Sequence, residues 1–404
     1  MKSVLKWLGI IVAVIALIAG GWFWSIGPDM RGLILDPPKD ANILFWSQSQ
    51  REIGFKMMDE LPALVKSVDI TPSTDIRELP VGEPLSVATS VDAFFEEQSL
   101  AGMLVLHEGN IRIERYGLGL TPERRWTSFS VAKSFTSNLV GIAIKEGDIN
   151  SIDDNVADYI EGLKDSAYDG VSIGQLLTMT SGVDWNEDYS DPQSDVALFN
   201  NHIATDGLPT IVSYMRGLSR AHPPGEQWLY STGETNLIGI LVEQATQRSL
   251  ADYFSEKIWQ PFGMADRATW LLGADGNEIS GCCVQASLRD FARYGLFVLE
   301  DGNINGSSIL PDNWLSTATT KQADIGITGS GYGYQWWTFD DGTFTARGIF
   351  GQTIFIDPGR QLVVAFNGNW PNARETKLND ERFEFIEELQ KAVDDEANGE
   401  LINE

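Results

Sequence analysis

The first feature of the sequence is an unbroken apolar run near the N-terminus, from Trp7 to Trp24. Its 18 residues would span roughly 27 Å as a helix, close to the thickness of a bilayer's hydrocarbon core. Lysines precede the run and tryptophans end it, which favours a helix with a cytoplasmic N-terminus. A cleaved signal peptide is the alternative, but the run is long and Ala19–Gly21 is a poor cleavage site. We therefore predict an uncleaved anchor, and either interpretation exports the rest of the chain.

The segment after this run shows no sustained hydrophobic period. It is proline-rich and irregular as far as about residue 87, except for one helical pattern near Gln50–Lys66. We predict that it is a tether that packs on the main domain. The predicted organisation is a cytoplasmic stub at 1–6, an anchor at 7–24, a tether or N-terminal extension at 25–87, a main domain at 88–395 and an acidic tail at 396–404.

Strand patterns mark both ends of the main domain. Apolar runs flank the turn Glu108–Asn110 within Met103–Tyr116, which predicts a β-hairpin. Three more apolar segments in the last third predict strands, and a turn at Asp357–Arg360 joins the final two. These three segments are Tyr332–Trp337, Thr353–Ile356 and Gln361–Phe366.

Helical patterns fill the region between these strands. One runs from Ser128 to Lys145 and stops at Gly147. Ser287 is followed at the third position by an acid, a pattern that indicates the start of a helix. A last helix is expected from about Asn379 to Val393. The predicted fold class is therefore α/β (α+β): an antiparallel sheet flanked by helices, plus a mostly helical lobe at about 150–300.

The composition restricts the classes of partner that the protein can bind more than it restricts the reaction that the protein could catalyse. The chain has 404 residues, of which 57 are acidic and 29 basic, giving a formal net charge of −28. This excess excludes nucleic acid or an anionic membrane surface as the main partner, because both require clustered positive charge. A hydrophobic content of 43% excludes wholesale disorder.

The two cysteines of the chain are neighbours, Cys282 and Cys283. Outside the cytoplasm they could oxidise to a disulfide. Two packed thiols beside Gly281 are the favoured alternative, because a disulfide between adjacent residues strains the backbone.

Several kinds of active site are absent from the sequence. There is no His-Glu-x-x-His or Cys-x-x-Cys motif, and the chain has 3 histidines, so we expect neither a metal centre nor any other cofactor. No nucleophile elbow of the Gly-x-Ser-x-Gly type supports a Ser-His-Asp triad. His107 and His222 are more consistent with structural roles. No glycine-rich phosphate loop follows a strand.

The remaining candidate is Ser130-Val-Ala-Lys133, at the start of a predicted helix. Residues three apart share a helix face, so the Lys133 amine can reach the Ser130 hydroxyl. The positive end of the helix dipole and desolvation both lower the pKa of such a lysine. A neutral lysine can then accept the serine proton and activate the nucleophile. Alone the motif is weak, because Ser3-Val-Leu-Lys6 has the same spacing by chance.

Three ordered segments make this candidate specific. They are Thr127–Phe135, Ile173–Gly182 with its Leu-Leu-x-x-x-Ser-Gly pattern, and Pro224–Gly233 with its Pro-Gly-x-x-x-x-Tyr-Ser pattern, in which Thr232 stands where asparagine is more usual. With them the sequence resembles the serine β-lactamase and penicillin-binding-protein superfamily, in its class C-like hydrolase branch, over about residues 90–393.

The resemblance implies a β-lactamase/transpeptidase-like fold and assigns site residues. It places Ser130 as nucleophile, with Lys133 and Tyr230 as its proton-transfer partners. The backbone amides of Ser130 and Ile349 are expected to form the oxyanion hole. No metal or organic cofactor is implied.

The sequence departs from the family at the Lys-Thr-Gly or His-x-Gly motif. Ala346-Arg-Gly348 occupies that place, so the usual cation is missing and substrates of the β-lactam or peptidoglycan-stem type are in doubt. Arg347 is a candidate substrate-binding replacement, although strand alternation would turn its side chain to the other face.

Within the superfamily, the pattern is most similar to the 6-aminohexanoate-dimer hydrolase-like group. The segments that carry this similarity are Gly182–Tyr189, Gly281–Cys283, Tyr332–Trp337 and Arg347–Gln352. In that group a loop tyrosine closes over the substrate amide, and Tyr189 is the position that matches, as a substrate-binding candidate. Its alternative role is packing on Trp185.

We therefore expect an exported serine hydrolase, held in the inner (cytoplasmic) membrane by a single span, with a periplasmic catalytic domain. It would cleave a small-molecule ester or amide through an acyl-enzyme on Ser130. A β-lactamase or DD-carboxypeptidase acting on cell-wall peptides is one alternative, and a non-catalytic binding module of the same fold is another.

Overall fold

The computed structural model describes residues 2–61 and 66–399, and the chain divides into two compact units, 1–55 and 56–404. The stub at 1–6 and the acidic tail at 396–404 fall partly outside the described residues. The boundary between the units falls inside the segment that the sequence predicts as a tether, at 25–87.

The first unit is helical. Helix α1, Lys2–Ser25, contains the apolar run, and its stretch Ser3–Ser25 is long and apolar enough to cross a membrane, with a mean hydropathy of 2.3. None of its 18-residue apolar window is buried, and a signal sequence would meet the same criteria. The unit's other elements are α2 Pro28–Leu35, η1 Ile43–Phe45 and α3 Gln48–Lys56, whose last residue opens the second unit.

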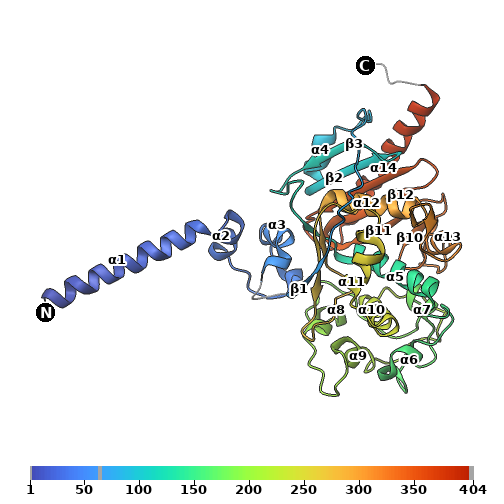
Figure 1. Cartoon of the computed structure of the whole chain (residues 1–404), viewed down its shortest axis with the longest axis horizontal. Coiled ribbons are helices and arrows are strands. Elements are labelled where there is room, and N and C mark those ends of the chain that lie inside the picture. Colours follow the sequence, from blue (N-terminus) through green and yellow to red (C-terminus); the bar gives the residue numbers. More distant parts are fainter. Residues whose placement is uncertain (1, 62–65, 400–404) are drawn as a thin grey trace. The chain divides into compact units, whose positions relative to one another are not determined.

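The second unit is built on a seven-stranded antiparallel sheet, in the order β3-β2-β13-β12-β11-β10-β9 (Figure 1). Its central strands come from opposite ends of the unit, because β2 pairs with β13. The strands are β2 Leu100–His107, β3 Asn110–Tyr116, β9 Ser330–Tyr332, β10 Trp337–Phe339, β11 Phe344–Gly348, β12 Gln352–Asp357 and β13 Leu362–Gly368.

Helices cover both faces of this sheet. Met103 and Val105 of β2 pack with α4 and α14 in one apolar core, while their neighbours Leu104 and Leu106 belong to the core that contains α5 and α12. This alternation is the period-two pattern of a strand buried on both sides. The covering helices are α4 Val91–Glu97, α5 Ala132–Glu146, α12 Leu288–Leu299 and α14 Thr376–Asn398.

A second, four-stranded sheet in the order β1-β5-β6-β4 leads into the site. Its outer strand β4 is followed directly by η3, Phe129–Val131, and then by α5. The strands are β1 Lys66–Ile70, β4 Trp126–Thr127, β5 Ala268–Leu272 and β6 Val284–Ala286; a small pair, β7 Asn303–Ile304 and β8 Ser307–Ser308, stands apart from both sheets.

The middle of the chain forms the helical lobe. Helix α10, Thr232–Thr246, packs against α5 and so joins the lobe to the start of the sheet region. In Figure 1 the short helices of this lobe gather at the end of the unit away from β3 and α4. The remaining helices are α6 Val156–Tyr159, η4 Glu161–Leu163, α7 Ile173–Leu177, α8 Asp195–Leu198, η5 Phe199–Asn201, α9 Thr210–Met215, α11 Leu250–Phe254, η6 Ser255–Trp259, α13 Trp314–Ala318, η2 Met58–Glu60 and η7 Ile349–Gly351.

Most predicted elements are confirmed, including the hairpin at 103–116, the cap at Ser287 and the overall α+β arrangement with its helical lobe. Two predictions are wrong in detail. Tyr332–Trp337 is not one strand but the end of β9, a turn and the start of β10, because Gln335 takes a positive φ of 64°. The helical pattern near Gln50–Lys66 is α3 and η2, and Lys66 begins β1, which pairs with β5; residues 62–65 lie outside the description.

Candidate active site

Ser130 lies in the 3-10 turn η3, directly before α5. Strand β6 of the small sheet holds the residue before this turn, Ser128: the backbone amide of Val284 donates to the Ser128 hydroxyl over 2.9 Å, and the Ser128 amide donates to the Val284 carbonyl over 2.8 Å. Ser130 is 9% exposed. The hydroxyl is therefore held at a fixed place at the N-terminal end of a buried helix.

Lys133 lies one turn further along, with its side chain 1% exposed. Its Nζ is 3.4 Å from the Ser130 Oγ, 3.0 Å from the Thr232 Oγ1 and 2.7 Å from the Gly281 carbonyl oxygen. Burial lowers the pKa of Lys133 to about 8, although the negative charge of Glu187 acts to raise it. A substantial fraction of this amine is consequently neutral near physiological pH and able to accept a proton.

Tyr230 lies beside Lys133, whose Nζ is 5.3 Å from the centre of the tyrosine ring. The ring stacks on Trp337 and meets Tyr332 edge-on. Burial raises the pKa of Tyr230, as does the charge of Glu187, while a side-chain hydrogen bond with Ser130 acts in the opposite direction. The phenol is thus protonated, and its ring lies next to the lysine that contacts the candidate nucleophile.

The end of strand β11 approaches the nucleophile turn closely. A Cβ on Gly348 would lie 2.7 Å from the Ser128 carbonyl oxygen and 3.1 Å from the Cβ of Phe129, so the two segments are in contact. Ile349 follows immediately in η7, and the side chains of Phe129 and Phe350 pack together with ring centres 5.5 Å apart. The structure therefore brings the backbone around Ile349 to the Ser130 turn.

An acidic residue that sequence reasoning passed over completes the polar network. The Glu187 carboxylate accepts hydrogen bonds from the Tyr189 hydroxyl at 2.7 Å, from the Thr232 amide at 3.0 Å, from the Thr232 hydroxyl and from the Trp185 indole N–H. Glu187 also caps the N-terminus of α10, where a negative charge is stabilised. The available signal was an acid between two aromatic residues in Gly182–Tyr189.

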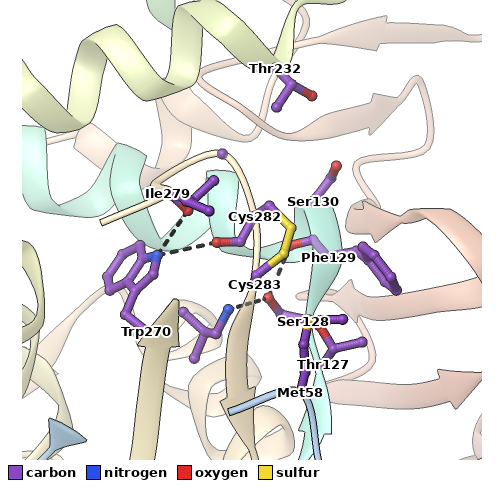
Figure 2. The surroundings of a disulfide bond; sticks show 12 residues. Met58, Thr127, Ser128, Phe129, Ser130, Thr232, Trp270, Ile279, Cys282 and Cys283 are labelled. Atoms are coloured by element: carbon purple, nitrogen blue, oxygen red, sulfur yellow. Dashed lines mark hydrogen bonds between the residues drawn. A yellow bond between two sulfur atoms is a disulfide. The ribbon is translucent and has the colours of Figure 1, made fainter. Parts of the chain in front are cut away.

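Gly281 and the two cysteines form the turn that supplies the third lysine partner. Contrary to the favoured expectation of two thiols, Cys282 and Cys283 are joined by a disulfide, and Cys283 has a positive φ of 74°. Figure 2 shows this disulfide between Trp270 and the Ser128–Ser130 segment; the indole donates to the carbonyl oxygens of Ile279 and Cys282.

The two predicted substrate-binding residues have different neighbours in this part of the structure. Tyr189 is partly buried, bonded to Glu187, and covered by the Arg374 guanidinium 5.1 Å above its ring. Arg347 lies over Trp337 at 5.4 Å, donates to the Asn379 side chain, and has a pKa lowered to about 10 by burial. Ala346, which stands where the family carries a cation, is buried at 1% exposure.

The histidines contact groups other than Ser130, and His202 is hydrogen-bonded to the Ser213 hydroxyl. His107 lies on β2 beside Arg112, and His222 is exposed. Residues 2–61 and 66–399 contain no group of three or more His, Cys, Asp or Glu side chains that could hold a metal ion.

Comparison with known proteins identifies the arrangement. The family model described as Beta-lactamase matches residues 87–386, which include every site residue named above. The chain belongs to the β-lactamase family. It is accordingly a serine hydrolase of the β-lactamase and penicillin-binding-protein superfamily, as its motifs indicate.

Individual relatives show which proteins the chain resembles in sequence. The chain is 27% identical over 292 residues to a 6-aminohexanoate-dimer hydrolase of Paenarthrobacter ureafaciens, covering 69% of this chain and 74% of that protein. A β-lactamase of Pseudomonas fluorescens is 24% identical over 201 residues, or 48% of this chain and 50% of its own length.

Solved structures share the β-lactamase-like fold. The structure named "Putative 6-aminohexanoate-dimer hydrolase" from Bacillus anthracis has a TM-score of 0.74 at 23% identity, covering 85% of this chain and 94% of its own. A penicillin-binding protein from Bacillus halodurans has a TM-score of 0.58 at 17% identity, covering 74% of this chain and 99% of its own. The predicted fold is therefore confirmed.

Proposed function

We propose that this hydrolase cleaves an ester or amide bond through an acyl-enzyme on Ser130. The observation that supports this most directly is the buried Ser130–Lys133 pair, whose lysine has a pKa lowered to about 8 and lies beside the Tyr230 ring. A general base with a pKa near the working pH combines a usable neutral fraction with sufficient basicity.

The proposed reaction uses groups of this chain alone. Neutral Lys133, with Tyr230 beside it, accepts the Ser130 proton as Oγ attacks the substrate carbonyl carbon. The amides of Ser130 and Ile349 stabilise the negative charge that develops on the carbonyl oxygen. As the tetrahedral intermediate collapses, Tyr230 or the protonated Lys133 donates a proton to the leaving oxygen or nitrogen. Water then attacks the ester on Ser130, and the acid product leaves.

The substrate is proposed to be a small linear ester or amide. Tyr189 would close over it, and Arg347 is the proposed basic residue on the β11 side of the site, in place of the family cation missing at Ala346. A β-lactam would find no cation for its carboxylate at the Ala346 position itself. The hydrolysis of 6-aminohexanoate dimers by a relative supports the linear amide class and does not by itself identify the native compound.

We further propose that α1 anchors the enzyme in the cytoplasmic membrane with its catalytic unit outside. The length and hydropathy of Ser3–Ser25 and the preceding lysines support this. The Cys282–Cys283 disulfide is consistent with an oxidising compartment.

Covalent labelling tests the enzymatic proposal. Wild-type protein should react stoichiometrically with a fluorophosphonate probe, and Ser130→Ala should not react. Equal labelling of both proteins would contradict Ser130 as nucleophile, and no labelling of folded wild-type protein would favour a binding module. Kinetics on short-chain esters, linear amides and a chromogenic cephalosporin then separate the substrate classes. Faster turnover of the cephalosporin would favour a β-lactamase instead.

A further inference from the structure

The hydrogen bonds around Lys133 determine where its lone pair points. A neutral amine has two N–H donors and one lone pair. Two of the three neighbours of Nζ are the Gly281 carbonyl oxygen at 2.7 Å and the Thr232 Oγ1 at 3.0 Å. If each accepts one N–H, the lone pair is left for the third neighbour, the Ser130 hydroxyl at 3.4 Å.

This arrangement depends on the direction of a single hydroxyl proton. The Thr232 hydroxyl can donate only one hydrogen bond. In the structure that proton goes to the Glu187 carboxylate, so the Thr232 oxygen is available as an acceptor for Lys133. Without an acceptor at this position, the hydroxyl could turn and donate to the Lys133 lone pair, which would remove the base from Ser130.

Hydrogen bonds hold the Glu187 carboxylate in the position that this arrangement requires. Its two oxygens accept from four donors: the Trp185 indole, the Tyr189 hydroxyl, the Thr232 amide and the Thr232 hydroxyl. An ionised carboxylate has about four acceptor sites, so these donors satisfy it and leave no site for a substrate ammonium group. The residue therefore acts on the reaction through Thr232.

We propose that Glu187 is a positioning residue that, through Thr232, directs the lone pair of Lys133 onto Ser130 and links the Tyr189 loop to the catalytic base. The proposal rests on the proposed acyl-enzyme function of Ser130. Because Glu187 also bonds to the Tyr189 hydroxyl, a substrate that moves the Tyr189 loop would change the setting of the base.

Glu187 has a second effect, which its charge exerts on the pKa of Lys133. Its negative charge raises the pKa of Lys133, against the lowering caused by burial. Other titratable groups around this pair include Tyr189, which bonds to Glu187, Tyr230 beside the lysine and Tyr332 on β9, all of which feel the charge of Glu187. The Arg374 guanidinium lies over the Tyr189 ring. Removing the charge should consequently lower the Lys133 pKa further, so that the lysine stays neutral to a lower pH.

The test compares Glu187→Gln with a matched control on the same loop. Asp188→Asn removes the neighbouring charge, while its exposed side chain can still accept from the Ser190 amide and hydroxyl. The acylation rate of the full-length protein by a fluorophosphonate probe is measured from pH 5.5 to 10 for each protein, together with its thermal stability.

For Glu187→Gln we expect the maximal rate to fall by about 10- to 100-fold, because the single amide oxygen must face the two N–H donors, of Thr232 and Trp185, which cannot turn away. The amide NH2 then faces the Thr232 hydroxyl, which accepts from it and turns its own proton to Lys133. We also expect the acid limb of the pH profile to move to lower pH. Asp188→Asn should leave both unchanged. A Glu187→Gln profile like that of wild type, or an equal effect of Asp188→Asn, would overturn the proposal. Absence of labelling in wild type would instead reject the proposed function itself.

Thr232 variants distinguish positioning from a structural role. Thr232→Ser keeps the hydroxyl and should retain most of the rate, whereas Thr232→Val should lose about as much as Glu187→Gln. The double variant Glu187→Gln/Thr232→Val should then be no slower than Thr232→Val alone, because both changes break the same connection. Additive losses, or equal loss in Thr232→Ser, would contradict the connection through Thr232.

Discussion

The general-base pair that we propose, Ser130 and Lys133, depends on the immediate neighbours along the chain and on two partners that are distant in sequence. The spacing of three residues puts both side chains on one face of the helical segment formed by η3 and α5, where Nζ lies 3.4 Å from Oγ. Burial then lowers the lysine pKa to about 8. Spacing alone provides the contact, while the environment provides the basicity.

This pKa gives a pH dependence for the wild-type enzyme. The reactive form of Lys133 is neutral, so the acylation rate should rise with pH until about 8 and level off above it. A fluorophosphonate or ester burst measured across this range at constant ionic strength checks the prediction. A rate that is flat down to pH 6, with the protein still folded, would contradict Lys133 as the base.

At the residue scale the sequence identified some residues of the candidate site and missed another. Ser130, Lys133 and Tyr230 were found because three ordered motifs surround them, and the structure brings them together. Glu187 was missed, because a single acid in a loop carries no periodicity and resembles any solvated charge. Its role becomes visible only when four hydrogen-bond donors converge on it.

At the scale of the elements, the site is the junction of the two sheets of the second unit. β4 of the small sheet leads into the Ser130 turn, and β11 of the large sheet ends against the same turn. The backbones approach so closely that Gly348 has no room for a side chain. The oxyanion hole that we propose depends on this approach.

Gly348→Ala should therefore damage catalysis more than folding. The added Cβ would lie 2.7 Å from the Ser128 carbonyl oxygen, so β11 must move and carry the Ile349 amide with it. Loss of one oxyanion donor lowers kcat by about 10²- to 10³-fold.

Steady-state ester hydrolysis and circular dichroism measure the two effects of Gly348→Ala. Gly359→Ala in the β12–β13 turn, where a Cβ would lie 3.4 Å from its nearest neighbour, is the control and should be near wild type. A fully active Gly348→Ala would show that the approach of β11 is unimportant.

The disulfide turn makes a separate prediction. It carries the Gly281 carbonyl that accepts from Lys133, so reduction of Cys282–Cys283 should loosen this contact. A net hydrogen bond contributes about 1 kcal/mol, which corresponds to a rate loss of about fivefold.

The acylation rate is compared before and after treatment with a phosphine reductant, with thiol alkylation and intact mass to count the free cysteines. Cys282→Ser/Cys283→Ser should have the lower rate in both conditions. An unchanged rate in fully reduced wild-type protein would show that the turn does not need the bond.

At the scale of the whole molecule, the chain combines a helical N-terminal unit with a catalytic unit of ordinary globular character. The proposed catalytic residues Ser130, Lys133 and Tyr230 do not explain the net charge of −28, because none of them is an acid. Glu187 is the one acid with a proposed part in the site. We attribute the rest of the excess to a solvated, self-repelling surface.

Anchoring by α1 can be tested on the intact protein. Ile11→Asp/Ile15→Asp places two charges in the middle of the apolar run, and each costs about 3 kcal/mol on insertion. We expect wild-type protein to remain in the membrane pellet after an alkaline wash and the variant to be released. Ile34→Asp in α2, outside the run, should behave as wild type. A wild-type protein that is recovered shortened and soluble would indicate a cleaved signal peptide.

The sequence by itself determined what depends on local order: the apolar run, the hairpin and its turn, the caps, and the Ser-x-x-Lys spacing within its motifs. These features arise between residues a few positions apart, so their geometry follows from helix and strand periods. The tertiary structure decided which groups surround the lysine. Thr232 and Gly281 are 99 and 148 positions away from Lys133, and no local period relates them to it. The charge, burial and direction of the base therefore arise only when α10, the disulfide turn and the Glu187 loop pack around α5.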